Sequence, residues 1–309
     1  MKKLYMILPL ALILCVIVGC QKQAEEVAAE KETEPTIIVD NAISTDGVSI
    51  AYEVRGKGEP ALLFVHGWSR NRTDWNVQMD YFAKNYKAIS IDLAGYGESG
   101  NNRNNWTMEA FGEDIVSVVT HLDIKKAILI GHSMGAPVVL KSAKLIPERV
   151  VGIVPVDMLH DVGQKNSIET IDTWVNGLMS QVNNPTEEII RSWFVNEVEE
   201  DLVSDFIQNY NSESKIGWED SLRNAFIWTS EGQENDLISI KTPICCINTD
   251  LRVPNVDLVR KYAPTFRVKI IKGSGHFLPQ EAPAEFNRVL EETIQEFVQI
   301  AEQKKKPFN

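Results

Sequence analysis

Short runs of apolar residues alternate with longer segments of mixed polarity from about residue 36 to the end of the chain. Two of these runs, residues 36–43 and 48–54, flank Asp46 and Gly47, a pair typical of the turn in an antiparallel hairpin. Six further runs are predicted to be strands: residues 61–65, 88–92, 127–130, 150–156, 243–248 and 267–271. Strands that are apolar along their whole length, with helices between them, favour a parallel sheet covered on both faces.

Helical spacing of apolar residues predicts helices at residues 75–84, 107–122, 136–145, 256–262 and 283–303. Thr107 is a candidate N-cap for the second of them. The alternation breaks between residues 158 and 240, where the pattern predicts amphipathic helices only. That segment holds four of the seven tryptophans: Trp174, Trp193, Trp218 and Trp228. We therefore expect one α/β domain, residues 36–157 and 241–309, interrupted by a helical cap at residues 158–240.

The first 35 residues have a different composition. Lys2 and Lys3 precede an apolar stretch, residues 4–18, which is short for a spanning helix and typical of a secretory signal. The stretch ends in residues 17–20, Ile-Val-Gly-Cys, which resemble a bacterial lipobox. The resemblance implies that residues 1–19 are a signal peptide and that Cys20 becomes lipidated; an uncleaved membrane anchor is the alternative. Residues 20–35 are predicted to be a flexible tether, holding the domain outside the cytoplasm at a membrane of the bacterial cell envelope.

Charge and cysteine content exclude some classes of partner. The 309 residues carry a net charge of −12, and no basic stripe is present that could neutralise phosphates, so nucleic-acid binding is not expected. Cys245 and Cys246 are adjacent in an apolar run, where side chains point to opposite faces of a strand, so we expect two buried thiols rather than a disulfide or a metal site. The sequence does not indicate an oligomeric state.

The most informative motif is G-x-S-x-G at residues 131–135. It follows a predicted strand and precedes a predicted helix, which is the context in which a serine is held on a tight turn with its hydroxyl exposed above a sheet. Gly131 and Gly135 suit this turn because side chains there would collide with neighbouring backbone. Ser133 is therefore the candidate nucleophile.

A nucleophilic serine needs a base, and His276 is the candidate. It lies in the glycine-rich segment 273–277, directly after the last predicted strand. His66 and His132 adjoin other turns and are predicted to be structural. The two remaining histidines are His121, in a predicted helix, and His160, at the start of the cap.

Two aspartates follow strands at the edge where ligands bind in parallel sheets, and either could orient the base. Asp250 follows the strand at residues 243–248, whereas Asp157 follows the strand at residues 150–156 and leads directly into the cap. We predict Asp250 as the acid, with Asp157 as its competitor.

Acyl transfer also needs donors for a developing oxyanion. The backbone N–H of Met134, next to the nucleophile, is one predicted donor. The other is the backbone N–H of Trp68, in the turn His66-Gly67-Trp68, where Gly67 permits close approach of the backbone. The indole of Trp68 either walls the acyl side of the pocket or is a half-buried core aromatic.

The order Ser133, Asp250, His276, together with the 66–68 turn and the segment Asp92–Ser99, resembles the α/β-hydrolase superfamily over about residues 37–300. The resemblance implies an eight-stranded, mostly parallel sheet with an antiparallel second strand, helices on both faces and a helical lid. Serine at the nucleophile position disfavours haloalkane dehalogenases and epoxide hydrolases of this fold, which use aspartate there. The elbow also differs from the Gly-Gly-Ser-Trp-Gly-like sequence of proline iminopeptidases.

The resemblance and the residues together predict a serine carboxylesterase. It would act on esters of small to medium apolar substrates through an acyl-enzyme, with no metal or organic cofactor. The alternatives are a cofactor-free perhydrolase, a carbon–carbon bond hydrolase, or a low-turnover ligand-sensing protein of the same fold.

Overall fold

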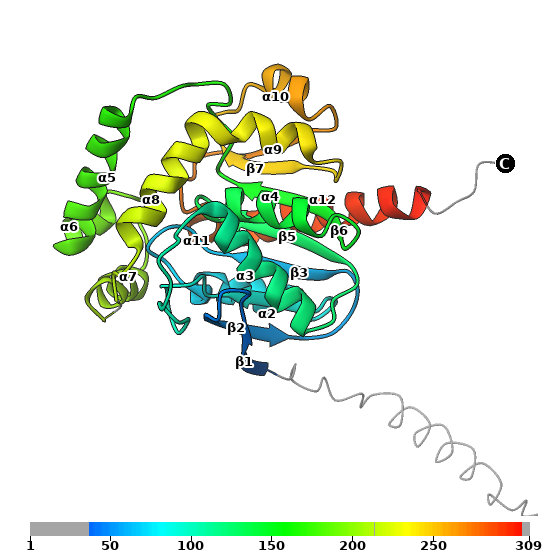
Figure 1. Ribbon diagram of the computed structural model, residues 1–309, viewed down its shortest axis with the longest axis horizontal. Helices are drawn as coiled ribbons and strands as arrows, with labels where there is room; N and C mark the ends of the chain where they lie inside the picture. Colours follow the sequence, from blue (N-terminus) through cyan, green and yellow to red (C-terminus); the bar gives the residue numbers. More distant parts are fainter. Residues whose placement is uncertain (1–36, 213, 305–309) are drawn as a thin grey trace, which may run out of the picture. The chain divides into compact units, whose positions relative to one another are not determined.

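The computed structural model describes residues 37–212 and 214–304. Eight strands form one sheet in the order β1-β2-β4-β3-β5-β6-β7-β8 (Figure 1). The strands are β1 (Ile37–Ile43), β2 (Ser49–Arg55), β3 (Ala61–Val65), β4 (Ala88–Ile91), β5 (Ala127–His132), β6 (Val150–Val156), β7 (Cys245–Thr249) and β8 (Arg267–Ile271). Strand β2 is antiparallel to both of its neighbours, and the remaining pairs are parallel. The predicted sheet and its antiparallel second strand are confirmed.

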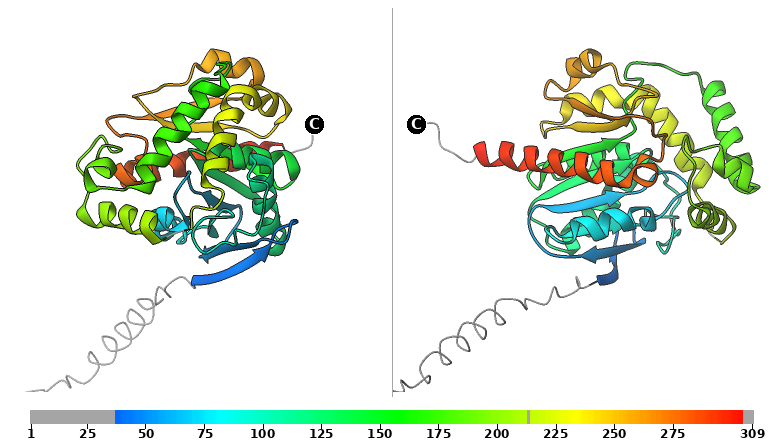
Figure 2. Two further views of the ribbon diagram at one scale, coloured as in Figure 1. Left: turned by 60° about the vertical axis from the view of Figure 1, so that its left-hand side comes forward. Right: turned by 180° about the vertical axis from the view of Figure 1, so that it is seen from behind.

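Two layers of helices cover the sheet. Helices α3 (Met108–His121) and α4 (Gly135–Leu145) lie on the face toward the viewer in Figure 1. On the opposite face, seen in the right panel of Figure 2, lie α2 (Asn76–Phe82) and α12 (Pro283–Gln303). Successive residues of β5 alternate between these layers: Leu129 belongs to the first apolar cluster, while Ile128 and Ile130 belong to the second. Burial on both faces explains why the strands are apolar throughout.

A group of helical elements lies between β6 and β7 and is called the cap below. Its elements are α5 (Ile168–Asn183), α6 (Glu187–Arg191), α7 (Glu200–Ser212), α8 (Trp218–Ile227), the π-helical turn η2 (Trp228–Gly232) and α9 (Gln233–Ser239). Local capping explains where two of these helices begin, because the side chains of Ser167 and Thr186 accept hydrogen bonds from the first turns of α5 and α6. Helix α9 returns to the core and packs against α4.

Three short elements complete the fold: η1 (Arg72–Trp75), α10 (Val256–Tyr262) and α11 (Leu278–Glu281). Thr107 caps α3 by accepting a hydrogen bond from the Ala110 N–H, as predicted. Cys245 and Cys246 are buried free thiols, also as predicted, and burial raises the pKa of both.

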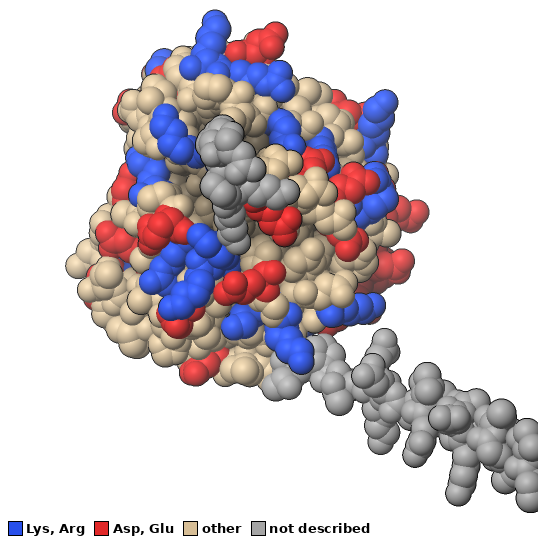
Figure 3. Space-filling model, turned by 90° about the vertical axis from the view of Figure 1, so that its right-hand side faces the viewer, with Lys and Arg blue, Asp and Glu red and all other residues tan. Residues whose placement is uncertain are grey.

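On the face shown in Figure 3, basic and acidic side chains are interspersed rather than segregated. Within residues 37–212 and 214–304, no helix is long and apolar enough to cross a membrane. The predicted signal peptide, the predicted lipidation site Cys20 and the whole of the predicted tether lie outside the described residues.

Candidate active site

Ser133 occupies a strained turn between β5 and α4. Its φ angle is +50°, in the left-handed region that residues with a side chain rarely adopt. A Cβ added to Gly131 would lie 2.2 Å from the carbonyl oxygen of Gly135, and one added to Gly135 would lie 2.6 Å from that of Val65. The tight packing on both sides accounts for the two glycines of the motif and leaves Ser133 lining a cavity.

His276 lies in the loop between β8 and α11 and lines the same cavity as Ser133. Its Nδ1 is 2.7 Å from Oδ2 of Asp157, which leaves Nε2 free for a partner in the cavity. The loop is held from the nucleophile turn, because His132 Nε2 lies 2.7 Å from the carbonyl oxygen of His276 and donates to it. Burial lowers the pKa of His132 to about 3, so this imidazole stays neutral.

Asp157 directly follows β6 and, like Ser133, has a left-handed backbone, with φ of +49°. Its carboxylate is buried, and Nε2 of His160 lies 3.6 Å from Oδ1. Although burial by itself raises the pKa of Asp157, the hydrogen bond and charge of His276 outweigh that effect and hold the pKa below its usual value. Asp157 is thus a buried, ionised partner for the histidine.

The prediction that Asp250 pairs with His276 is wrong. Asp250 is exposed, and its Oδ1 accepts a hydrogen bond from the Gly273 N–H at 2.9 Å, so it caps the turn after β8. The competitor, Asp157, makes the contact instead. Strands β6 and β7 are neighbours, so Asp157 and Asp250 follow strands that end at the same edge of the sheet. The path of the loop that carries His276 determines which of the two carboxylates the imidazole contacts.

The turn at residues 66–68 lies against Ser133. A Cβ on Gly67 would lie 3.2 Å from Nδ1 of His132 and 3.3 Å from Cβ of Ser133, so a side chain at residue 67 would crowd this turn. Within the turn, His66 donates from Nδ1 to the Gly67 carbonyl at 2.7 Å and accepts from the Leu93 N–H at Nε2 at 3.0 Å. Burial lowers the pKa of His66 to about 4, consistent with this neutral tautomer. Trp68 and Met134, which carry the two predicted backbone donors, line the same cavity as Ser133.

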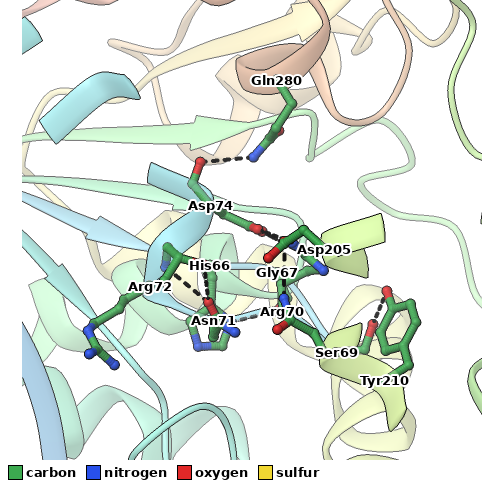
Figure 4. Close-up of polar contacts among 12 residues, drawn as sticks. His66, Gly67, Ser69, Arg70, Asn71, Arg72, Asp74, Asp205, Tyr210 and Gln280 are labelled. Carbon is green, nitrogen blue, oxygen red and sulfur yellow. Dashed lines mark hydrogen bonds and ion pairs between the residues drawn. The ribbon is translucent and has the colours of Figure 1, made fainter. Parts of the chain in front are cut away.

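A buried ionic network fixes the segment after this turn (Figure 4). Arg70 is 1% exposed and donates from Nε to both carboxylate oxygens of Asp74, at 2.9 and 3.1 Å. It also contacts Asp205 of cap helix α7 at 3.1 Å, and its guanidinium lies 3.4 Å from the ring centre of Phe206. The Ser69 hydroxyl is 3.1 Å from that of Tyr210, also on α7. The cap is therefore anchored to Ser69 and Arg70, directly after the turn at residues 66–68.

A second anchor joins the cap to the histidine loop. Glu281, at the end of α11, accepts from the backbone N–H groups of Val195 and Asn196 in the cap, at 3.1 and 3.2 Å. Its other oxygen accepts from the Gly275 N–H at 3.0 Å, next to His276. Nothing in the sequence pattern pointed to Glu281, because its partners come from segments 80 or more positions distant or from a loop.

The cavity has a volume of about 680 Å³ and is lined both by residues at the ends of the strands, among them Ser133 and Asp157, and by residues of the cap. Trp68, Trp174 and Trp193 line it, together with Phe226 and Phe277. The other two cap tryptophans serve packing. Trp218 is fully buried and Trp228 is 4% exposed. Trp218 stacks on Tyr96, with ring centres 5.5 Å apart, and its Nε1 donates to the Gly95 carbonyl.

Comparisons with known proteins agree with this architecture. A family model described as the alpha/beta hydrolase fold matches residues 60–283. A Haemophilus influenzae protein provisionally named esterase/lipase is 26% identical over 235 residues, which is 72% of this chain and 79% of that protein.

Solved structures with a similar fold include two esterases. The esterase EaEST from Exiguobacterium antarcticum gives a TM-score of 0.72 at 19% identity, over 84% of this chain and all of that one. A thermophilic esterase from Thermogutta terrifontis gives 0.70 at 21% identity, over 85% of this chain and 99% of that one. With a matching family model over most of its length, an eight-stranded sheet of the expected order and a serine on a strained strand–helix turn, the chain belongs to the α/β-hydrolase fold family.

Proposed function

We propose that this protein is a serine carboxylesterase. The observation that carries the proposal is the Asp157–His276 hydrogen bond in a cavity that Ser133 enters from a strained turn. The proposed nucleophile, base and acid follow three different strands of the sheet, β5, β8 and β6, and together they supply the groups that acyl transfer uses.

In the first half of the reaction, the Ser133 hydroxyl attacks the ester carbonyl carbon while Nε2 of His276 takes its proton. The carbonyl oxygen becomes an oxyanion, and the backbone N–H groups of Trp68 and Met134 donate to it. The tetrahedral intermediate then collapses, and the alcohol leaves with the proton from His276. Asp157 keeps the proton of the neutral imidazole on Nδ1 and stabilises the imidazolium when it forms.

In the second half, a water molecule attacks the acyl-enzyme and His276 takes one of its protons. The second tetrahedral intermediate collapses, the carboxylic acid is released, and His276 returns the proton to the Ser133 oxygen. No further reactant is needed to balance the two steps.

The cavity lining supports apolar groups of small to medium size on the substrate. Trp68, Trp174, Trp193 and Phe226 supply flat apolar walls, and 680 Å³ is within the range of small-molecule pockets. The relatives named as esterases in the comparisons support the same reaction class.

The direct test is turnover of p-nitrophenyl acetate and butyrate by the full chain, together with labelling of Ser133 by a fluorophosphonate probe. We expect both, and we expect Ser133→Ala to abolish labelling and reduce hydrolysis by several orders of magnitude. If the wild-type protein neither turns over these esters nor is labelled, the esterase proposal fails, and a ligand-sensing protein of this fold becomes the favoured alternative. Activity unchanged in Ser133→Ala would refute the assignment of the nucleophile.

Perhydrolysis is a second candidate because of one relative. A bifunctional esterase/perhydrolase of Acinetobacter calcoaceticus is 34% identical over 92 residues, which is 33% of that protein. Formation of peracetic acid from acetate and hydrogen peroxide, dependent on Ser133, would establish this activity beside ester hydrolysis. Carbon–carbon bond hydrolysis needs a panel of β-diketone substrates.

We also propose that the protein is exported and anchored to a bilayer through lipidated Cys20, with the hydrolase domain outside the cytoplasm. The support is the positive n-region, the apolar stretch and the lipobox-like residues 17–20. Mass spectrometry of the membrane fraction should find the mature chain beginning at a diacylated Cys20. Cys20→Ala should lack the lipid, and an unmodified N-terminus in the wild type would refute the proposal.

A further inference from the structure

One side chain connects the cap to the loop that carries His276. Glu281 is half-buried at the end of α11, and its Oε1 accepts a hydrogen bond from the Gly275 N–H at 3.0 Å. Its Oε2 accepts from the backbone N–H groups of Val195 and Asn196, at 3.1 and 3.2 Å, and from the side-chain amide of Asn196 at 3.3 Å. A carboxylate has about four lone-pair sites, and hydrogen bonds to it are stronger than those between neutral groups. Glu281 therefore holds a segment of the cap and the backbone next to His276 on a single charged group.

The cap segment also contacts the loop directly. Asn196 donates from Nδ2 to the Gly273 carbonyl oxygen at 2.7 Å. A Cβ added to Gly275 would lie 2.6 Å from Oε1 of Glu281 and 3.0 Å from Cγ2 of Val195, so a side chain there would displace the carboxylate or the cap. The cap and the carboxylate thus pack closely against the backbone of this loop.

Aromatic contacts hold the residue that follows the histidine. Phe277 is 8% exposed, and its ring centre lies 5.2 Å from that of Phe194 and 5.1 Å from that of Phe206, both in the cap. It also lies nearly parallel to the ring of Trp193, with ring centres 6.4 Å apart. The cap therefore contacts the chain both before and after His276.

The positions of these neighbours matter because the imidazole itself is only partly enclosed. The His276 side chain is 43% exposed, and its Nδ1 contacts Asp157. A general base must lie within about 2.6–3.2 Å of the atom whose proton it takes. A displacement of about 1 Å in the backbone of the loop would therefore take Nε2 out of reach of the Ser133 hydroxyl.

We propose that Glu281 is a positioning residue for His276, and that it acts by fixing the loop at residues 273–277 to cap residues 195–196. The inference rests on the proposed esterase function and deepens it, because it makes catalysis depend on the docked position of the cap. Neither Glu281 nor Asn196 lines the cavity, so loss of their contacts misaligns the base without removing a wall of the substrate site. The effect should therefore fall on kcat rather than on KM.

The first test compares Glu281→Gln with wild type in hydrolysis of p-nitrophenyl butyrate by the full chain. Glutamine keeps one acceptor oxygen but places an amide nitrogen against the donors that the other oxygen accepts from. We expect kcat to fall about tenfold, as for the loss of one hydrogen bond to a charged group, with KM within about twofold of wild type. Glu285→Gln is the matched control, because Glu285 is an exposed glutamate that pairs with Arg288. Its kcat should match that of wild type.

A second variant keeps the inference testable if Glu281→Gln does not fold. Asn196→Ala, at an exposed position of the cap, removes the side-chain bonds to Gly273 and Glu281 and should lower kcat about threefold. In both variants the NMR chemical shift of His276 Nδ1, which reports the hydrogen bond to Asp157, should move toward that of an imidazole in water.

An unchanged kcat and an unchanged chemical shift, whatever happens to the free energy of unfolding, would overturn the inference, because Glu281 would then serve folding alone. A loss expressed in KM with kcat unchanged would overturn it as well. If the wild-type protein neither hydrolyses the ester nor reacts with the fluorophosphonate probe, the esterase proposal fails. The chemical shift then still decides whether Glu281 positions His276.

Discussion

The ends of β6 and β7 carry the same residue type at neighbouring positions of one sheet edge, yet the two aspartates differ in almost every physical respect. Asp157 is 7% exposed, has a left-handed backbone and contacts His276 at 2.7 Å. Asp250 is exposed and accepts a bond from a loop N–H. The end of a strand places an aspartate at the edge of the sheet. Burial and contact with His276 determine which of the two aspartates can orient that histidine.

The largest difference is expected in catalysis. Asp157→Asn removes the charge that stabilises the imidazolium and favours the wrong tautomer of His276, so kcat for p-nitrophenyl butyrate should fall about 10⁴-fold. Asp250→Asn, the matched control, should stay within about threefold of wild type because Asp250 does not touch the histidine. Equal losses in the two variants, or a larger loss in Asp250→Asn, would reverse the assignment.

Arg70 contacts one buried and one more exposed aspartate, so the effect of burial can also be tested on the free energy of unfolding. Asp74 has a side chain 4% exposed, whereas the side chain of Asp205 is 47% exposed, and both contact this one guanidinium. Asp74→Asn leaves a buried cation short of its counter-ion and should cost about 3–5 kcal/mol of unfolding free energy in urea titrations. Asp205→Asn should cost at most about 1 kcal/mol, because water screens the exposed pair. Similar losses would show that burial does not decide the strength of these pairs.

Because His132 and His66 are buried, the stability of the folded protein should also depend on pH. In the unfolded chain a histidine binds its proton near pH 6.5, whereas the folded pKa values are about 3 for His132 and about 4 for His66. Between these limits the unfolded state holds more protons, so stability falls as the pH decreases from 7 to 5, by about 2 kcal/mol for each residue.

The variant His132→Gln keeps a donor for the His276 carbonyl but cannot take up a proton. It should therefore lose about 2 kcal/mol less than wild type between pH 7 and pH 5, measured as the difference in urea unfolding free energy. Identical pH dependence in the two proteins would mean that His132 is not held neutral by burial.

The smallest effect concerns the loop that Asp250 caps. Asp250→Ala removes the bond to the Gly273 N–H and should lower the unfolding free energy by about 1 kcal/mol, equivalent to about 2–4 °C in Tm. The pH profile of kcat should not change. A shift in that profile would mean that the loop cap controls the position of His276.

Local features of this protein could be predicted from the sequence because their causes are local. The strands at residues 61–65 and 267–271 and the helix at 283–303 were predicted with the bounds the structure has, because apolar runs and helical spacing specify them. Gly131 and Gly135, which flank Ser133, indicated a tight turn, because side chains at these positions would collide with neighbouring backbone. The split of the cap tryptophans into cavity lining and packing could not be predicted, because helical spacing does not show what each face meets.

The sequence by itself thus determined the sheet and the tight turn that carries Ser133, since strand burial and turn geometry depend on neighbouring residues. Only the tertiary structure decided which aspartate contacts His276, the cap anchor Glu281 and the unpaired oxygen of Gln233. These depend on contacts between segments 80 or more residues apart or on a π turn, and their energies come from burial and pairing that no local pattern encodes.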